Sequence, residues 1–448
     1  MHRIVNGILF LFMLNCALSA QDAPDFKKVD AETYRFYTEK NWDSLIEMGE
    51  SAIKQGIDYY YLRMRIGIAW YEKSNYVKSS RHFIKALDFN NREPVALEYL
   101  YYSYLFTGRI HQANLLSKEF SPLLKEKTGI RPRPVDELNI NFFYNHSGTE
   151  DMVSSSSEYF STDIPGYQIV TQYFSNFNFS LRHKLGPRFT LLHSYTYLNK
   201  VNLYHFYNGS ITVRNPDFMV KQHQYYISVN TAFKKGWGIS PTFHFINTGY
   251  PYLSSVIQGG QGRPPTAQYI DQNESSLLAG LMVTKLLGPV DLRIYGHGSN
   301  LNNRNQLQGA AGLTYYPFGN LDVYVGGDFV LLAQNGDSNK VINPIGCGLI
   351  GFSIARKVWF EISTSVGEMN NYAERNGYLI YNSADILRQK YDLNIAVPLS
   401  DKGSLIYAGV RYSSYSSYLT SLIEPELKDL NELSYNSLSF YGGILWKF

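Results

Sequence analysis

Apolar and polar residues alternate over most of the chain from Glu137 to Phe448. In the stretch "SLSFYGGILWKF", for example, Leu438 and Phe440 are apolar, and the serine before each of them is polar. Successive side chains of a β-strand point to opposite faces, so a period of two predicts strands with one apolar and one polar face.

Two kinds of connection separate these segments. The short ones are Gly186-Pro187, Lys235-Gly236, Gly288-Pro289, Gly319-Asn320, Arg356-Lys357 and Asp401-Lys402-Gly403. The others are mostly longer and cover residues 147–167, 208–218, 248–273, 335–339, 370–378 and 421–432. About fourteen strands lie between them, and an even count with alternating short and long connections predicts a transmembrane antiparallel β-barrel. A soluble sandwich is the alternative. The pattern leaves open whether residues 249–273 fold into the pore or cap it.

Residues 30–128 have the charged, Leu- and Ala-containing composition of helices, and they repeat. Trp42, Tyr76 and Ile110 are spaced by 34 residues, a period typical of paired helices. The fold class expected for the whole chain is therefore α + β and multi-domain, with helical repeats before the barrel.

The middle repeat, "IGIAWYEKSNYVKSSRHFIKAL", resembles the tetratricopeptide repeat family in its small residues on a first helix and its aromatic residues at the turn and on a second helix. About 2.5 repeats fit, the first keeping mainly its second helix. The residues expected to pack the repeats are Trp42, Gly67, Ala69, Tyr71, Tyr76, Phe83, Ala86, Gly108 and Ala113. The resemblance implies a concave surface that binds a protein or peptide. A generic stack of helical hairpins is the alternative.

Four segments follow from these patterns. Residues 1–20 carry a positive charge, an apolar run and small residues, as secretory signal peptides do; Cys16 leaves lipidation as an alternative. The repeat domain covers residues 30–128, a Pro-containing linker residues 129–136, and the barrel residues 137–448. We expect a location in the outer membrane of a Gram-negative-type bacterium, with the repeat domain in the periplasm.

The composition disfavours several functions. The formal charge of +3 is too weak to indicate a nucleic-acid partner. The 38 tyrosines and 26 phenylalanines, with only 18% charged residues, are typical of a barrel in lipid. The ten histidines have no metal-ligand spacing, and no nucleophile, phosphate-binding or paired-carboxylate motif is present. We therefore expect no enzyme activity, no metal and no cofactor. Cys347 alone remains after signal cleavage, which excludes an intrachain disulfide.

The polar phase of the strands predicts which charged side chains face the lumen, because a Lys or Arg against lipid would cost about 2 to 4 kcal/mol. These candidates are Arg182, Lys184, Asp291, Arg293, Asp322, Asp328, Glu361, Arg388, Lys390, Asp392 and Arg411. Both signs occur, so the set suits either cross-lumen ion pairs or a polar path for a weakly charged solute.

The end of the chain resembles the signal of outer-membrane barrels that the envelope insertion machinery reads. The matching residues are Tyr441, Gly443, Trp446 and Phe448. The resemblance implies outer-membrane lipid and that machinery as partners.

Helical repeats followed by such a barrel resemble the architecture of exopolysaccharide exporters and of smaller repeat-plus-barrel outer-membrane proteins. The resemblance implies envelope transport or export of a solute or polymer, with an unknown periplasmic protein bound by the repeats. A non-conducting structural or assembly anchor is the alternative, and an outer-membrane hydrolase is a more remote one.

Overall fold

The computed structural model describes residues 25–448 except 132, 162, 258–265, 336–339, 400–402 and 424–430. The expected signal peptide, residues 1–20, lies outside the described residues. The chain divides into two compact units, Met1–Ile130 and Arg131–Phe448. No helix in the described ranges is long and apolar enough to cross a membrane.

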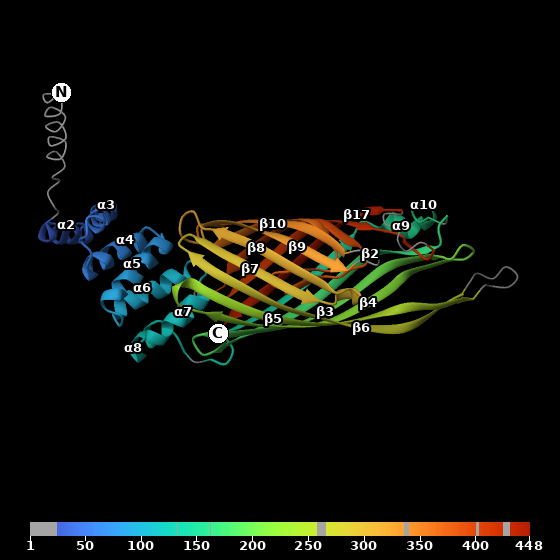
Figure 1. Ribbon diagram of the computed structural model, residues 1–448, viewed down its shortest axis with the longest axis horizontal. Coiled ribbons are helices and arrows are strands. Elements are labelled where there is room, and N and C mark those ends of the chain that lie inside the picture. Colours follow the sequence, from blue (N-terminus) through green and yellow to red (C-terminus); the bar gives the residue numbers. More distant parts are fainter. Residues whose placement is uncertain are drawn as a thin grey trace, which may run out of the picture. The chain divides into compact units, whose positions relative to one another are not determined.

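Paired helices make up the first unit (Figure 1). Their bounds are α2 (Phe26–Thr38), α3 (Trp42–Lys54), α4 (Tyr60–Glu72), α5 (Tyr76–Phe89), α6 (Pro94–Leu105), α7 (Ile110–Leu116), the 3-10 turn η1 (Ser117–Glu119) and α8 (Pro122–Lys127). Lys40, Ser74 and Gly108 have φ values of 55°, 58° and 71°. These left-handed residues lie 34 positions apart, each in the turn between two helices, so the hairpin itself recurs with the period of the sequence.

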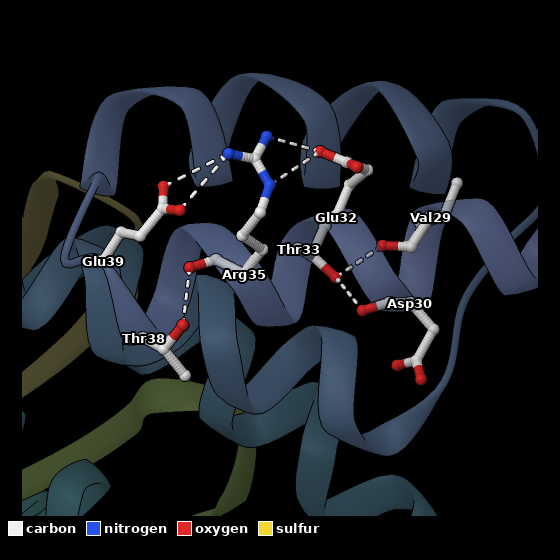
Figure 2. Close-up of polar contacts among 7 residues, drawn as sticks. All are labelled: Val29, Asp30, Glu32, Thr33, Arg35, Thr38 and Glu39. Carbon is white, nitrogen blue, oxygen red and sulfur yellow. Dashed lines mark hydrogen bonds and ion pairs between the residues drawn. The ribbon is translucent and has the colours of Figure 1, made fainter.

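The first hairpin is complete, whereas the sequence indicated mainly its second helix. Only Val29 and Thr33 of α2 are buried, so this helix has a weak apolar signal. Its own side chains support it instead (Figure 2): Arg35 lies 2.6 Å from Glu32 and 3.3 Å from Glu39. Ion pairs at these spacings connect successive helical turns.

Small residues let the helices of this unit approach closely. A Cβ atom at Gly67 would lie 2.9 Å from the ring of Phe83, and Phe83 is fully buried. Ala69, Ala86 and Ala113 are also fully buried. Tyr71 and Tyr76 are in edge contact at 5.2 Å, and Trp42 contacts Tyr37 at 6.1 Å between ring centroids.

The second unit is a closed antiparallel barrel. Its wall strands are β1 (Glu137–Ser147), β2 (Gly166–Leu185), β3 (Phe189–Tyr207), β4 (Thr212–Ala232), β5 (Trp237–Ile257), β6 (Thr266–Leu287), β7 (Val290–Ser299), β8 (Gln306–Tyr315), β9 (Val323–Asn335), β10 (Lys340–Ile354), β11 (Val358–Met369), β14 (Ile386–Pro398), β15 (Leu405–Ser417) and β17 (Leu433–Lys447). Each pairs with its neighbour along the chain, and β1 pairs with both β2 and β17. The predicted fourteen-stranded barrel is thereby confirmed within the described residues.

Exposure alternates along the wall strands because every second side chain faces outward. On β7, Ile294 is 67% exposed while Tyr295 is buried. On β4, Gln222 and Gln224 are buried, whereas His223 between them and Tyr225 after them are exposed. Apolar and aromatic side chains therefore cover the outer surface, and amides, hydroxyls and charged groups face inward.

The strands β2 to β6 continue further than the sequence pattern indicated. The connection expected over residues 208–218 shrinks to residues 208–211, and β5 and β6 pair as far as Ile257 and Thr266. Figure 1 shows β6 extending beyond β7, its next neighbour in the sheet. The β-branched and aromatic residues of β5 and β6 favour a continued hairpin over an irregular loop.

Candidate functional site

The connection between β11 and β14 is the element that occupies the lumen. We call residues 370–385 the lumenal hairpin; it contains the short strands β12 (Tyr372–Glu374) and β13 (Leu379–Tyr381), which pair with each other. Tyr372 is fully buried, and Asn371 and Ala373 are each 1% exposed. The sequence predicts an ordinary outer connection here. Of the residues 249–273 that it singled out, the described ones, 249–257 and 266–273, belong to β5 and β6.

Carboxamide side chains of the wall hold the backbone of this hairpin. Gln308 on β8 donates to the carbonyl of Ala373 at 2.7 Å and accepts from its N–H at 3.1 Å. Gln306 donates to the carbonyl of Asn371 at 2.8 Å. These two glutamines supply the hydrogen bonds that a neighbouring strand would give to β12.

The tip of the hairpin reaches the opposite part of the wall. Gly377 has φ 81°, and a Cβ atom there would lie 2.7 Å from Leu278, so glycine is required both by conformation and by space. The ring Nδ1 of His244 lies 2.7 Å from the carbonyl of Gly377. Tyr378 donates to Asn178 on β2 at 3.0 Å.

Polar and ionic contacts hold both arms of the hairpin, through Glu374 on β12 and Tyr381 on β13. Lys390 donates to Glu374 at 2.7 Å, and the hydroxyl of Tyr381 donates to the same carboxylate at 2.9 Å. Arg411 donates to Asp392 at 2.7 Å and to Tyr381 at 3.2 Å. Breaking a buried ion pair of this kind is costly, because removing one partner leaves the charge of the other buried without compensation.

A cavity of about 480 Å³ lies between the hairpin and the wall. Its polar lining is dominated by amides and tyrosines, namely Asn139, Asn141, Asn176, Asn178, Gln222, Gln224, Asn382 and Asn394 with Tyr378, Tyr381, Tyr407, Tyr415 and Tyr441. Phe143 stacks between Phe174 at 5.5 Å and Tyr441 at 5.9 Å on one side. The cavity offers both donors and acceptors beside an aromatic surface, which suits a polar organic molecule.

The eleven charged residues proposed for the lumen fall into separate groups. Glu361, Asp392 and Arg411 line the cavity, and Lys390 holds the hairpin. Six others form ion pairs: Arg182 with Glu137, Lys184 with Asp136, Arg293 with Asp328, Asp322 with Arg356, and Arg388 with Glu368. Asp291 lies near the start of β7. Most of the set thus makes ion pairs, and a minority surrounds the cavity.

Sequence reasoning missed the residues of the lumenal hairpin and its docking glutamines. The sequence predicts an outer connection for Glu374 and Arg375, because no local sequence feature distinguishes a loop that folds into the lumen from one that stays outside. The turn residues Asn376-Gly377, followed directly by the aromatic and aliphatic stretch "YLIY" at 378–381, are a hairpin signal in the sequence.

The four residues assigned to barrel insertion lie on or next to β17. Tyr441 pairs with Phe143 and Gly443 with Asn141 on β1. A Cβ atom at Gly443 would lie 2.4 Å from the carbonyl oxygen of Ile140, so this glycine permits the close contact at the seam. Trp446 and Phe448 are each 46% exposed.

Comparisons with known proteins found similar solved structures but no related sequence. No protein-family model matches the chain, and no curated protein matches its sequence. The P. putida toluene transporter TodX is similar over 70% of this chain and 91% of its own, at 6% identity and a TM-score of 0.45. A Pseudomonas aeruginosa FadL homologue is similar over 70% and 90%, at 7% identity and a TM-score of 0.41. The MamA R50E mutant is similar over 22% and 72%, at 20% identity and a TM-score of 0.21.

The class of the protein follows from its own geometry. In the described part of the chain the wall is closed, its outer face is apolar and aromatic, and its lumen is polar. Only such closed sheets satisfy every backbone hydrogen bond within lipid. The chain is a transmembrane β-barrel protein with an N-terminal helical region.

Proposed function

We propose that this protein transports a small polar solute across the outer membrane, through the lumen and past the lumenal hairpin. The observation that carries the proposal is the cavity of about 480 Å³ with its lining of amides and tyrosines. A barrel that served only as an anchor would need no such cavity between the lumenal hairpin and the wall. The volume falls in the range of sites for small organic molecules.

The lumenal hairpin acts as the gate in this proposal. It is attached to the wall largely through hydrogen bonds and ion pairs, such as those of Ala373 with Gln308 and of Glu374 with Lys390. Water and solute can replace these contacts in a way that they cannot replace apolar packing. The hairpin can therefore move while the wall stays closed.

The test is single-channel conductance in planar bilayers, with the full-length mature chain beside a variant in which Gly-Ser-Gly-Ser replaces residues 372–381. We expect small, intermittent conductance from the native chain and large, steady conductance from the variant. A control that loses residues 252–256 and 267–271 from β5 and β6 should conduct like the native chain. Absence of conductance in both the native chain and the hairpin variant would refute transport.

The helical region has a docking role in the proposal. Its hairpins recur every 34 residues, which supports membership in the tetratricopeptide repeat family, and repeats of this kind bind proteins on their concave side. We place residues 30–128 in the periplasm, joined by the linker 129–136 to the barrel of residues 137–448, after removal of the signal peptide 1–20. Protease protection in intact cells and after outer-membrane permeabilisation tests this placement, because accessibility of the helical region in intact cells would contradict it.

A second function is a structural anchor for an envelope complex. The observation in its favour is the hairpin itself, which fills part of the lumen with contacts to β2, β5, β8, β14 and β15. A permanently closed native barrel, with conductance only in the hairpin variant, would favour this alternative.

A further inference from the structure

Arg375 occupies the tip of the lumenal hairpin in an unusual backbone conformation. Its φ is 51°, and the next residue, Asn376, has φ 56°. Residues other than glycine adopt this left-handed region at some cost, and such positions concentrate at functional sites. Asn, Asp and Gly are the usual residues at such turn positions, so an arginine here is uncommon.

The side chain of Arg375 lines the cavity and is exposed within the barrel. Among the residues that the structure describes, no hydrogen bond or ion pair engages its guanidinium group at contact distance. The other ionic side chains of the lining are held in place. Their hydrogen-bond partners are Ser383 for Lys200, Tyr324 for Glu361, the Thr171 backbone for Asp385 and Arg411 for Asp392.

We propose that Arg375 binds the carboxylate of a small polar solute, which rests on the proposed transport function and names its substrate class. A planar guanidinium with free N–H groups matches a carboxylate through two parallel hydrogen bonds. The amides and tyrosine hydroxyls around it bind hydroxyl or amide groups on the rest of the molecule.

The surrounding charges restrict the ligand to one negative charge. Glu361, Asp385 and Asp392 line the same cavity as Lys200, Arg375 and Arg411. The three anions offset the three cations, so the lining as a whole does not attract a polyanion. Glu374 and Glu361 act electrostatically on Arg375. Their carboxylates accept hydrogen bonds from other groups, Glu361 from Tyr324 at 2.8 Å and Glu374 from Lys390 at 2.7 Å. A hydroxylated monocarboxylate, such as a sugar acid, combines the single charge with the hydrogen-bonding edges that the lining supplies.

The experiment measures binding of radiolabelled glucuronate to the full-length mature protein in detergent by equilibrium dialysis. Glucose and glucosamine serve as competitors, because the three molecules share a skeleton and differ in charge. We expect saturable glucuronate binding that neither competitor displaces at equal concentration. Arg375→Gln should weaken binding about tenfold or more, the value of a charge-assisted hydrogen-bonded contact, and Arg375→Lys should restore part of it.

Arg388→Gln is the matched control, because Arg388 lies on β14 but pairs with Glu368 and does not line the cavity. This variant should bind glucuronate like the native protein. Equal binding of glucose and glucuronate, or native affinity in Arg375→Gln, would overturn the inference. Glucuronate binding without conductance would refute transport but support the carboxylate site. Conductance without glucuronate binding would support transport but refute the carboxylate site.

Discussion

Mild acid should destabilise the helical unit through His82 on α5. The His82 side chain is 8% exposed, and its Nδ1 lies 3.4 Å from a guanidinium nitrogen of Arg63. Burial, followed by the charge of Arg63, lowers the pKa of this imidazole to about 4, against about 6.5 in an unfolded chain. The folded state therefore favours the neutral ring.

The sign of the effect follows from proton uptake by the unfolded state. Below pH 6.5 the unfolded chain binds a proton at His82, whereas the folded chain does so only near pH 4, so unfolding becomes easier as the pH falls. The full stabilisation is present above pH 6.5. The shift of the pKa corresponds to about 3 kcal/mol in total, of which roughly 2 kcal/mol is lost by pH 5.

Thermal unfolding of the full-length mature protein in detergent, followed by ellipticity at 222 nm, reports the helices. From pH 7.5 to pH 5 we expect the melting temperature of the helical unit to fall by about 8 to 16 °C, at 4 to 8 °C for each kcal/mol. His82→Gln should remove most of this decrease. Asp58 does not interfere, because Arg63 lowers the pKa of this carboxyl further below pH 5. An equal decrease in the native protein and the variant would show that the reasoning is wrong.

Three further substitutions test the packing and the gate. Gly67→Val places a side chain against Phe83, where even a Cβ atom would lie at 2.9 Å, and should destabilise the helical unit by about 1 to 3 kcal/mol in the same thermal assay. Gly443→Val should impair closure of the barrel at Ile140, measured as loss of the heat-modifiable band in gel electrophoresis; normal mobility shifts would contradict the assigned seam. Lys390→Met leaves Glu374 without its ion-pair partner, which destabilises the docked hairpin by about 3 to 5 kcal/mol. This variant should show longer channel openings, and the double variant with Glu374→Gln should show shorter ones again.

Local patterns predicted the wall of the barrel well because each strand carries its own evidence. The alternation around Arg293, with Ile294 exposed to the outside, repeats in strand after strand and depends only on the two-residue period. The positions 34 residues apart in the helical region are likewise visible in sequence, since each hairpin uses the same turn.

The lumenal hairpin could not be placed in this way. Its position depends on Gln306 and Gln308, which lie on β8 some 65 residues earlier in the chain. The sequence of the hairpin specifies that it folds back on itself but not which surface receives it. For the same reason the sequence could not identify Arg375 as a residue of the cavity, because a charged residue in a Gly-containing turn ordinarily faces solvent.

The pairing of β1 with β17 has a consequence for the order of folding. Asn145 donates to Ser437 and Ser439 across the seam, contacts that join residues 292 and 294 positions apart. Contacts between such distant residues form slowly, whereas each helical hairpin brings together residues within a few tens of positions. Until β17 arrives, the growing sheet has an unpaired first strand that can pair with other chains. The helical unit should therefore fold early and on its own, while the incomplete barrel exposes the edge of β1 until β17 pairs with it.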